Sequence, residues 1–190
     1  MAERRTFCAF SGEHRLVSGD LATMLVAVKD RFDADPSERI LVFEEQTGRQ
    51  VDFDLRGTVA EVIARATPEP PRAGPGRPKL GVISREISLL PRHWEWLEAQ
   101  PNGASAALRR LVEEAKKRDP EGERVRHAIE ATSRFMTAMA GDLPGYEEAS
   151  RALFAKDWGR FEGLIGGWPE GLREQLSLLV EPAARATAEQ

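Results

Sequence analysis

The sequence predicts an α+β fold, and three changes along the chain carry that prediction. In the first third, short apolar runs alternate with turn residues, a pattern typical of hairpins and brief helices. Residues 67–80 hold five prolines, which is typical of a linker. From residue 123 onward, apolar residues recur at helical spacing. The predicted architecture is therefore an N-terminal ββαββα module, a central strand–helix–helix segment and a C-terminal all-α bundle.

Domain boundaries follow from the same changes in composition. The chain of 190 residues, 41% hydrophobic and 31% charged, is long enough for two or three small cores. The predicted boundaries are residues 1–66 for the α+β module, 67–80 for a basic Pro/Gly linker, 81–118 for the central segment, 123–181 for the helical domain and 182–190 for a tail without fixed structure.

Simple counts exclude several classes of protein. No run of 18 apolar residues is present, so we expect no membrane partner. The N-terminus MAERRTFCAF lacks the apolar stretch of an export signal, which predicts a cytoplasmic protein. The single cysteine, Cys8, excludes an internal disulfide, and the three histidines offer no metal-ligand cluster. We therefore expect neither a metal nor another cofactor.

Turns and caps define the elements of the N-terminal module. Gly12 separates the strands of a first hairpin, and Gly48 supplies the positive φ that the turn of a second hairpin needs. Asp20 and Thr58 precede apolar-periodic runs, where their side chains are suited to cap a helix. The predicted elements are strands Thr6–Ser11 and His14–Ser18, helix Leu21–Phe32, strands Ile40–Glu44 and Gln50–Leu55, and helix Val59–Ala66.

The catalytic candidates of this module do not form a set. Cys8 lies in an apolar strand, where a thiol behaves as a small hydrophobe. Asp52 and Asp54 alternate with apolar residues, as the solvent face of a half-buried strand does. A carboxylate pair for acid–base chemistry is the alternative. Because no nucleophile–base pair, phosphate loop or metal set can be assembled, we expect that the protein is not an enzyme. Activity that depends on Asp52 or His127 would contradict this.

Charge is distributed unevenly along the chain. Residues 72–118 hold ten Lys/Arg and five Glu, a net charge of +5, whereas the rest of the chain carries −9. Screening limits each field to roughly 8–10 Å at physiological salt, so the local charge decides attraction to phosphate. The central segment is thus able to attract nucleic acid although the whole chain has a net charge of −4.

The central segment is predicted to contain one strand and two helices. The strand places Ile83, Arg85, Ile87 and Leu89 on one side, and Ser84, Glu86 and Ser88 on the other. Pro91 begins a first helix over Arg92–Gln100. After a turn at Gly103, Ser105 caps a second helix, whose apolar face consists of Ala107, Leu108, Leu111, Val112 and Ala115.

This order of elements, with Pro91 after the strand and Gly103 and Ser105 in the turn, resembles the ribbon-helix-helix family of DNA-binding proteins. The resemblance implies a homodimer, in which two chains pair their 82–89 strands and interlock their helices. The polar face of the ribbon would enter the major groove, and the start of the second helix would hold a phosphate. The residues that the resemblance assigns to DNA are Ser84, Arg85, Glu86 and Ser88 in the ribbon, Ser105 and Ala106 at the helix start, and Arg109 and Arg110 beside them.

The linker adds a second DNA contact by resemblance. Gly76-Arg77-Pro78-Lys79 resembles the core of an AT-hook, in which Arg77, Pro78 and Lys79 would follow the minor groove. Proline and glycine keep the backbone thin enough for a groove about 6 Å wide, where the negative potential of A-tracts attracts arginine. Glu86 departs from the ribbon pattern because phosphates repel its carboxylate, although it could accept a hydrogen bond from cytosine N4.

The C-terminal part is predicted to be helical throughout. Its helices are a long one ended by Gly141, followed by Tyr146–Ala155, Trp158–Ile165 and Pro169–Val180. Over most of residues 6–180, the segments ILVFEEQTGRQVDFDLRG, GRPKLGVISREISLLPRHWEWL and LFAKDWGRF resemble an uncharacterised bacterial domain-of-unknown-function family. That resemblance implies no activity.

These observations predict a dimeric DNA-binding protein that acts as a transcriptional regulator, with the strand ribbon and the Arg77 arm on DNA. The alternative is a protein-interaction module, antitoxin-like or a scaffold. In that case the ribbon only dimerises, and the helical domain binds a protein partner. Salt-dependent DNA binding would favour the first hypothesis, and co-purification of a protein partner would favour the second.

Overall fold

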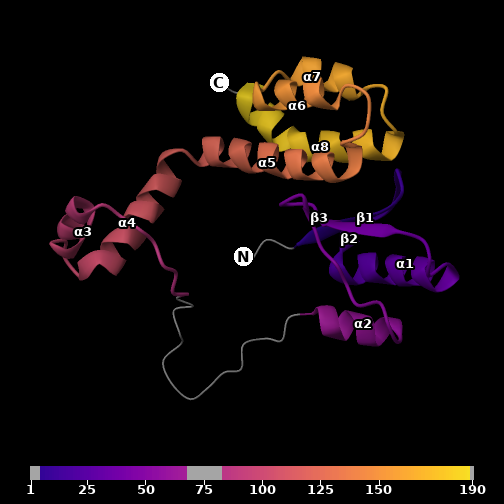
Figure 1. Cartoon of the computed structure of the whole chain (residues 1–190), viewed down its shortest axis with the longest axis horizontal. Coiled ribbons are helices and arrows are strands. Elements are labelled where there is room, and N and C mark those ends of the chain that lie inside the picture. The colour runs from indigo at the N-terminus through magenta and orange to yellow at the C-terminus, as the bar shows by residue number, and fades with distance from the viewer. Residues whose placement is uncertain (1–4, 68–82, 189–190) are drawn as a thin grey trace. The chain divides into compact units, whose positions relative to one another are not determined.

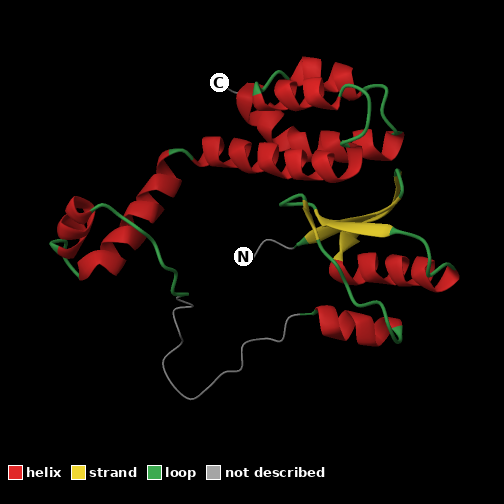
Figure 2. Cartoon of the chain, in the orientation of Figure 1, coloured by secondary structure: helices red, strands yellow, loops and turns green. Residues whose placement is uncertain are grey.

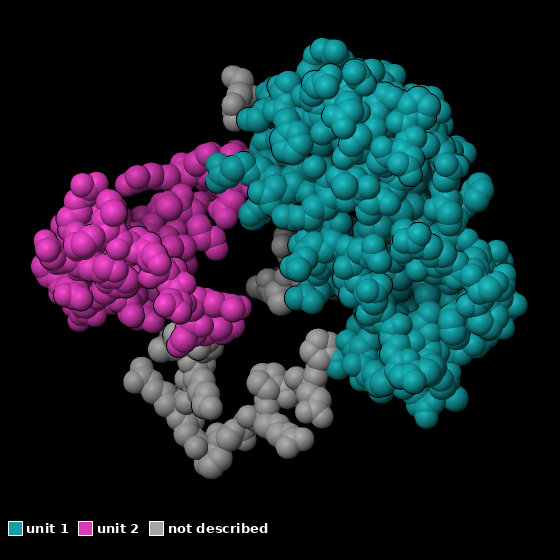
Figure 3. Space-filling view, in the orientation of Figure 1, with its two compact units in different colours: residues 1–68, 124–190 teal, residues 69–123 magenta. Residues whose placement is uncertain are grey.

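The computed structural model of the protein describes residues 5–67 and 83–188, which belong to two compact units (Figure 3). Unit 1 joins residues 1–68 to residues 124–190, and unit 2 consists of residues 69–123. Within the described residues the fold is mixed α+β, as predicted, with eight helices and a four-stranded antiparallel sheet near the N-terminus (Figures 1 and 2).

The sheet has the strand order β2-β1-β3-β4, and β1 is one of its two central strands. The strands are β1 (Thr6–Ser11), β2 (His14–Asp20), β3 (Ile40–Glu44) and β4 (Arg49–Gln50). The first three confirm the predicted strands, whereas the prediction of a strand over Gln50–Leu55 was wrong. Val51 still donates its N–H to the carbonyl of Val42 at 2.9 Å, and then the chain leaves the ladder.

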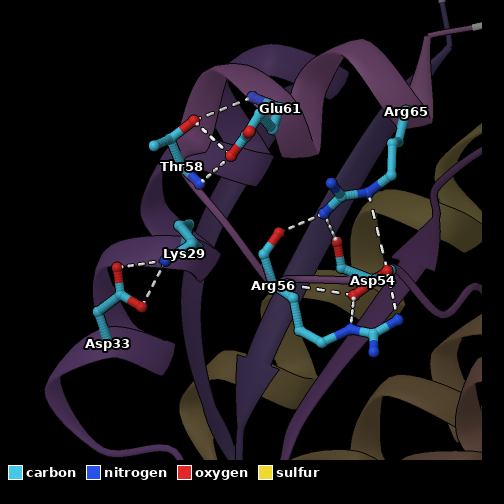
Figure 4. Close-up of polar contacts among 7 residues, drawn as sticks. All are labelled: Lys29, Asp33, Asp54, Arg56, Thr58, Glu61 and Arg65. Atoms are coloured by element: carbon cyan, nitrogen blue, oxygen red, sulfur yellow. Dashed lines mark hydrogen bonds and ion pairs between the residues drawn. The ribbon is translucent and has the colours of Figure 1, made fainter.

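Helices α1 (Leu21–Ala34) and α2 (Val59–Ala66) pack on one face of the sheet, and both begin at the predicted caps. The Asp20 carboxylate accepts a hydrogen bond from the Thr23 N–H at 3.0 Å. Thr58 and Glu61 form a reciprocal capping box, in which Glu61 also accepts from the Thr58 N–H at 2.7 Å (Figure 4). Local side-chain chemistry therefore fixes both helix starts.

Asp54 serves a structural role between β4 and α2 (Figure 4). Its carboxylate accepts hydrogen bonds from Nε and Nη2 of Arg56 at 2.8 and 2.9 Å, and Arg65 donates to its carbonyl at 2.8 Å. The hydrogen bonds from Arg56 hold the pKa of Asp54 far below its usual value. A carboxyl group that remains ionised in this way is poorly suited to general acid chemistry, which agrees with the predicted solvent-face role.

The C-terminal helices cover the other face of the sheet, so that unit 1 has three layers (Figure 1). These helices are α5 (Pro120–Ala140), α6 (Tyr146–Phe154), α7 (Trp158–Ile165) and α8 (Glu170–Ala188). Phe135 of α5 lies against Phe10 and Phe43 of the sheet, with ring centroids 5.3 and 5.0 Å apart. Strand residues of the N-terminal module and C-terminal helices thus share one core.

The alternation of β1 divides its side chains between two cores. Cys8 and Phe10 are buried against the C-terminal helices, and Phe7 and Ala9 are buried against α1 and α2. Burial raises the pKa of the Cys8 thiol to about 12. Cys8 therefore behaves as the predicted small hydrophobe rather than as a nucleophile.

Both hairpin turns of the sheet contact the C-terminal helices. In the β3–β4 turn, Gly48 has φ +63° and lies so close to α5 that an added Cβ would sit 2.0 Å from the Ala131 carbonyl oxygen. Arg134 donates to the carbonyl of Thr47 at 2.9 Å in the same turn. In the β1–β2 hairpin, Arg15 forms a 2.6 Å ion pair with Glu174 of α8.

Helix α8 is longer than predicted, because it runs through Pro182 to Ala188. The predicted tail after Pro182 is therefore helical up to Ala188, and Ala183 and Ala186 are buried in the core. A proline inside a helix removes one backbone hydrogen bond and costs about 3 kcal/mol. Burial of the following turn offsets this cost. Among the helices within residues 5–67 and 83–188, none combines the length and apolar composition needed to cross a membrane.

Candidate nucleic-acid interface

The described part of unit 2 is a helical hairpin preceded by an irregular segment. Helix α3 (Pro91–Glu98) begins with a proline at its first position, as predicted, and the Leu90 carbonyl accepts from the His93 N–H at 2.8 Å. Helix α4 (Gly103–Arg118) follows after a short turn. The two predicted helices are present, but α3 ends two residues earlier than expected.

Ser105 is not the cap of α4, contrary to the prediction. Asn102 occupies that position with φ +67°, and Gly103 follows with φ +75°. Helix α4 begins at Gly103, two residues before Ser105, so the Ser105 hydroxyl does not occupy the capping position. Ser105 and Ala106 instead lie in the first turn of α4. The Ser105 N–H is one of the first four backbone N–H groups of the helix, which lack intrahelical acceptors.

The predicted 82–89 strand is not formed within this chain. In the structure, residues 83–90 have no strand assignment (Figure 2), and Val82 lies outside the described residues. A strand requires a hydrogen-bonded neighbour, and the prediction placed that neighbour in a second copy. The four side chains assigned to the ribbon's DNA contact are nevertheless exposed: Ser84, Arg85, Glu86 and Ser88.

Unit 2 leaves much of its apolar surface in solvent. Leu97 and Ala107 are the only buried hydrophobic residues within its described part. Six of the nine large hydrophobic side chains that are exposed among the described residues belong to it: Ile83, Ile87, Leu90, Trp96, Leu111 and Val112. Within the described residues, the larger share of exposed large apolar side chains therefore belongs to the smaller unit.

Helix α4 also presents cations to solvent. Arg109 and Arg110 are exposed, and Arg110 is shared between Glu114 at 3.7 Å and the side-chain oxygen of Gln100 at 3.4 Å. Lys116 and Lys117 lie seven residues further on, and hence on the same sides of the helix as Arg109 and Arg110. The predicted DNA contacts of the linker, Arg77, Pro78 and Lys79, fall outside the described residues.

The fold and the site define an α+β protein whose second unit is a helical hairpin with exposed apolar and basic residues. The chain belongs to the family described as "Uncharacterized protein conserved in bacteria (DUF2239)", which matches residues 6–180. The predicted membership of an uncharacterised bacterial family is thereby confirmed. Comparison with curated proteins gave no match, and comparison with solved structures gave none either.

Sequence reasoning missed a polar cluster in unit 1. Ser18, Glu45, His127 and Gln175 line one pocket between the sheet, α5 and α8. A sequence signal for it exists, because Gln175 occupies an apolar-face position of α8, between the buried residues Leu172, Leu176 and Leu179. A buried polar residue at such a position calls for an explanation.

Proposed function

We propose that the protein binds DNA as a homodimer and that residues 83–118 form both its dimerisation element and its DNA contact. The observation that carries the proposal is the exposed apolar surface of this segment. Ile83 is 76% exposed and Ile87 48% exposed, although both belong to the apolar side of the predicted strand. Pairing of two copies would bury them and would supply the missing ladder.

The charges of this unit support the DNA contact. Five exposed cations lie on α4, at positions 109, 110, 116, 117 and 118, against two glutamates at 113 and 114. Neutralisation of phosphates by such cations releases counterions, which is the main source of sequence-independent affinity for DNA. The first turn of α4 adds backbone N–H groups that suit a phosphate oxygen. Sequence preference would come from the ribbon and the Arg77 arm.

We expect the wild-type protein to bind duplex DNA with strong salt dependence, and Arg109→Gln/Arg110→Gln to weaken that binding. Each phosphate contact that is lost should reduce the slope of log K against log salt by about 0.9. Fluorescence anisotropy with an AT-rich and a GC-rich duplex, at several salt concentrations, measures both quantities.

The matched control for that experiment is Arg151→Gln/Arg185→Gln. These arginines are exposed on α6 and α8 and pair with Glu148 and Glu181, so the double variant makes the same change in net charge elsewhere. We expect it to bind DNA like the wild type. Equal weakening by both variants would remove the assignment to α4, and a wild type that binds no duplex at low salt would overturn the proposal.

Dimerisation is tested separately with Ile87→Lys. Sedimentation or light scattering should give a dimer for the wild type and a monomer for this variant, because dimerisation would bury a charged lysine on the apolar side of each strand. Val26→Lys on α1 is the control, since Val26 is 42% exposed in unit 1. A monomeric wild type, or a dimer that Ile87→Lys leaves intact, contradicts the assignment of the dimer contact.

A second candidate function is a protein-interaction module, with the 83–90 segment acting only in dimerisation. The exposure of Trp96 and Val112, at 51% and 55%, favours it, because these helical residues add apolar surface beyond the ribbon itself. Aromatic anchors of this kind are enriched in protein interfaces. A dimer that Ile87→Lys dissociates and that binds no DNA would identify this function instead.

A further inference from the structure

Helix α3 presents a tryptophan, an arginine and a histidine together on one exposed side. Trp96 is 51% exposed, and Arg92 and His93 precede it by four and three residues. Side chains three and four residues apart are neighbours on a helix, so Arg92 and His93 both lie next to Trp96. Both of these neighbours are exposed as well. We call Arg92, His93 and Trp96 the α3 aromatic face.

The rest of α3 holds this face in place. Trp94 is half-buried and Leu97 is buried, and these two residues mark the covered side of the helix. Trp96 lies two residues after Trp94 and one before Leu97, so its side chain points away from that side. The Trp96 carbonyl accepts a hydrogen bond from the Gln100 side-chain nitrogen at 3.2 Å, and the Gln100 side-chain oxygen accepts from Arg110 of α4 at 3.4 Å. The exposed indole therefore belongs to a helix that is tied to its neighbour.

The charges on the α3 aromatic face favour an anionic partner. The side chains of Arg92 and His93 form no hydrogen bond or ion pair with another residue of the described ranges. Glu95 lies three residues after Arg92, but no ion pair within 4.0 Å joins them. Glu95 and Glu98 stand one residue before and two residues after Trp96, and hence on other sides of the helix. An aromatic ring is thus exposed beside a cation whose charge is not taken up.

Nucleic acids combine the two groups that such a face recognises, a flat ring and a phosphate. Every base has a π-face that can stack on an exposed tryptophan, and arginine binds phosphate. In a fully paired duplex the neighbouring base pairs already cover the faces of each base. The indole of Trp96 would therefore gain a stacking partner from an unpaired base and not from a paired one.

We propose that the α3 aromatic face is a stacking site for an unpaired base of DNA, with Arg92 on the adjoining phosphate. His93 would form a hydrogen bond to the edge of the stacked base. This inference rests on the proposed DNA contact of unit 2 and names the form of DNA that the contact selects, a strand with unpaired bases. Because stacking uses a feature that all bases share, the site should tolerate many sequences.

The test compares two labelled single strands of equal length by fluorescence anisotropy with the full-length protein. One strand is oligothymidylate, and the other is the same strand with every base removed, so that the phosphate charge is equal. We expect the wild type to bind the thymidine strand more tightly. Trp96→Ala should weaken binding of the thymidine strand by about 5- to 140-fold, the range for one stacked base, and leave the abasic strand unchanged. Unchanged binding of the abasic strand also shows that the variant is folded.

Two further variants separate stacking from charge. Arg92→Gln should weaken binding of both strands and reduce the magnitude of the slope of log K against log salt by about 0.7, whereas Trp96→Ala should leave that slope unchanged. Phe154→Ala is the matched aromatic control, since Phe154 is 59% exposed on α6 in unit 1. We expect it to bind both strands like the wild type.

Equal affinity of the wild type for the two strands overturns the stacking site, and so does equal weakening of both strands by Trp96→Ala. An effect of Trp96→Ala no larger than that of Phe154→Ala overturns it too, and would leave Trp96 to a protein interface. The duplex titration described above tests the proposed function independently. A wild type that binds duplex DNA but does not distinguish the two single strands retains the proposed function and loses only this inference.

Discussion

Gly48→Ala should lower the free energy of unfolding by about 2–5 kcal/mol, since a left-handed backbone costs a non-glycine residue about 1–2 kcal/mol and overpacking costs about 1–3 kcal/mol. Gly48 has φ +63°, and an added Cβ would meet the Ala131 oxygen, carbonyl carbon and Cα at 2.0, 2.7 and 2.9 Å. These are backbone atoms of α5, which cannot rotate away. Urea unfolding followed by tryptophan fluorescence measures the change.

Gly12→Ala separates the two contributions to that loss. Gly12 also lies in a hairpin turn of the sheet and has φ +54°, but an added Cβ there would meet nothing within 4 Å. We therefore expect the backbone cost alone, about 1–2 kcal/mol. The difference between the two variants measures the contact between the β3–β4 turn and α5. Equal losses for Gly12→Ala and Gly48→Ala would show that this contact is looser than the structure has it.

Phe135→Ala should destabilise the protein by about 3–5 kcal/mol, the range measured for truncation of buried aromatic residues. Phe135 is 1% exposed and lies between Phe10 and Phe43, at ring-centroid distances of 5.3 and 5.0 Å. Its removal leaves a cavity at the place where the sheet meets the C-terminal helices. The same urea titration, with the slope of the transition fitted for each variant, gives the loss.

The control for Phe135 is Phe154→Ala. Phe154 ends α6 and is 59% exposed, so the same truncation removes little buried surface and should change stability by less than about 0.5 kcal/mol. A loss for Phe135→Ala as small as this would mean that the two layers do not share a core. The double variant Phe10→Ala/Phe135→Ala then measures the coupling between the layers directly.

Elements fixed by neighbouring residues were predictable from the sequence. The caps at Asp20 and Thr58 are correct because the side chain and the N–H groups that it accepts from are only three residues apart. The alternation of Val51, Phe53 and Leu55 also reported burial correctly, since all three are half-buried. The same alternation predicted a strand over Gln50–Leu55, and this prediction was wrong for residues 51–55. Alternation indicates which side of a segment is covered, but it does not require a hydrogen-bonded neighbouring strand.

Features that depend on distant parts of the chain were not predictable in the same way. The run Phe7–Phe10 is apolar at every position because both faces of β1 are covered, but the sequence does not identify what covers them. Pro182 predicted a helix end, and burial of Ala183 and Ala186 overrides that local preference.

The candidate sites show the same contrast between features set by neighbouring residues and features that depend on distant segments. Arg85, Arg109 and Arg110 are exposed, and their assignment to DNA stays a prediction. The pairing of residues 83–90 depends on a second chain, which periodicity alone does not establish. The pocket around Gln175 was missed because its members come from four separate segments. Its one signal in the sequence is Gln175, a polar residue on the apolar face of α8.

The division of unit 1 between residues 1–68 and 124–190 has a consequence for synthesis of the protein. The ribosome completes the sheet long before Phe135 and the rest of α5–α8 emerge, at about 5–20 residues per second. During that interval Cys8, Phe10 and Phe43 have no helices to cover them. Core closure is thus a late, long-range event, which slows folding and leaves one sheet face open to chaperones or to aggregation until the last helices arrive.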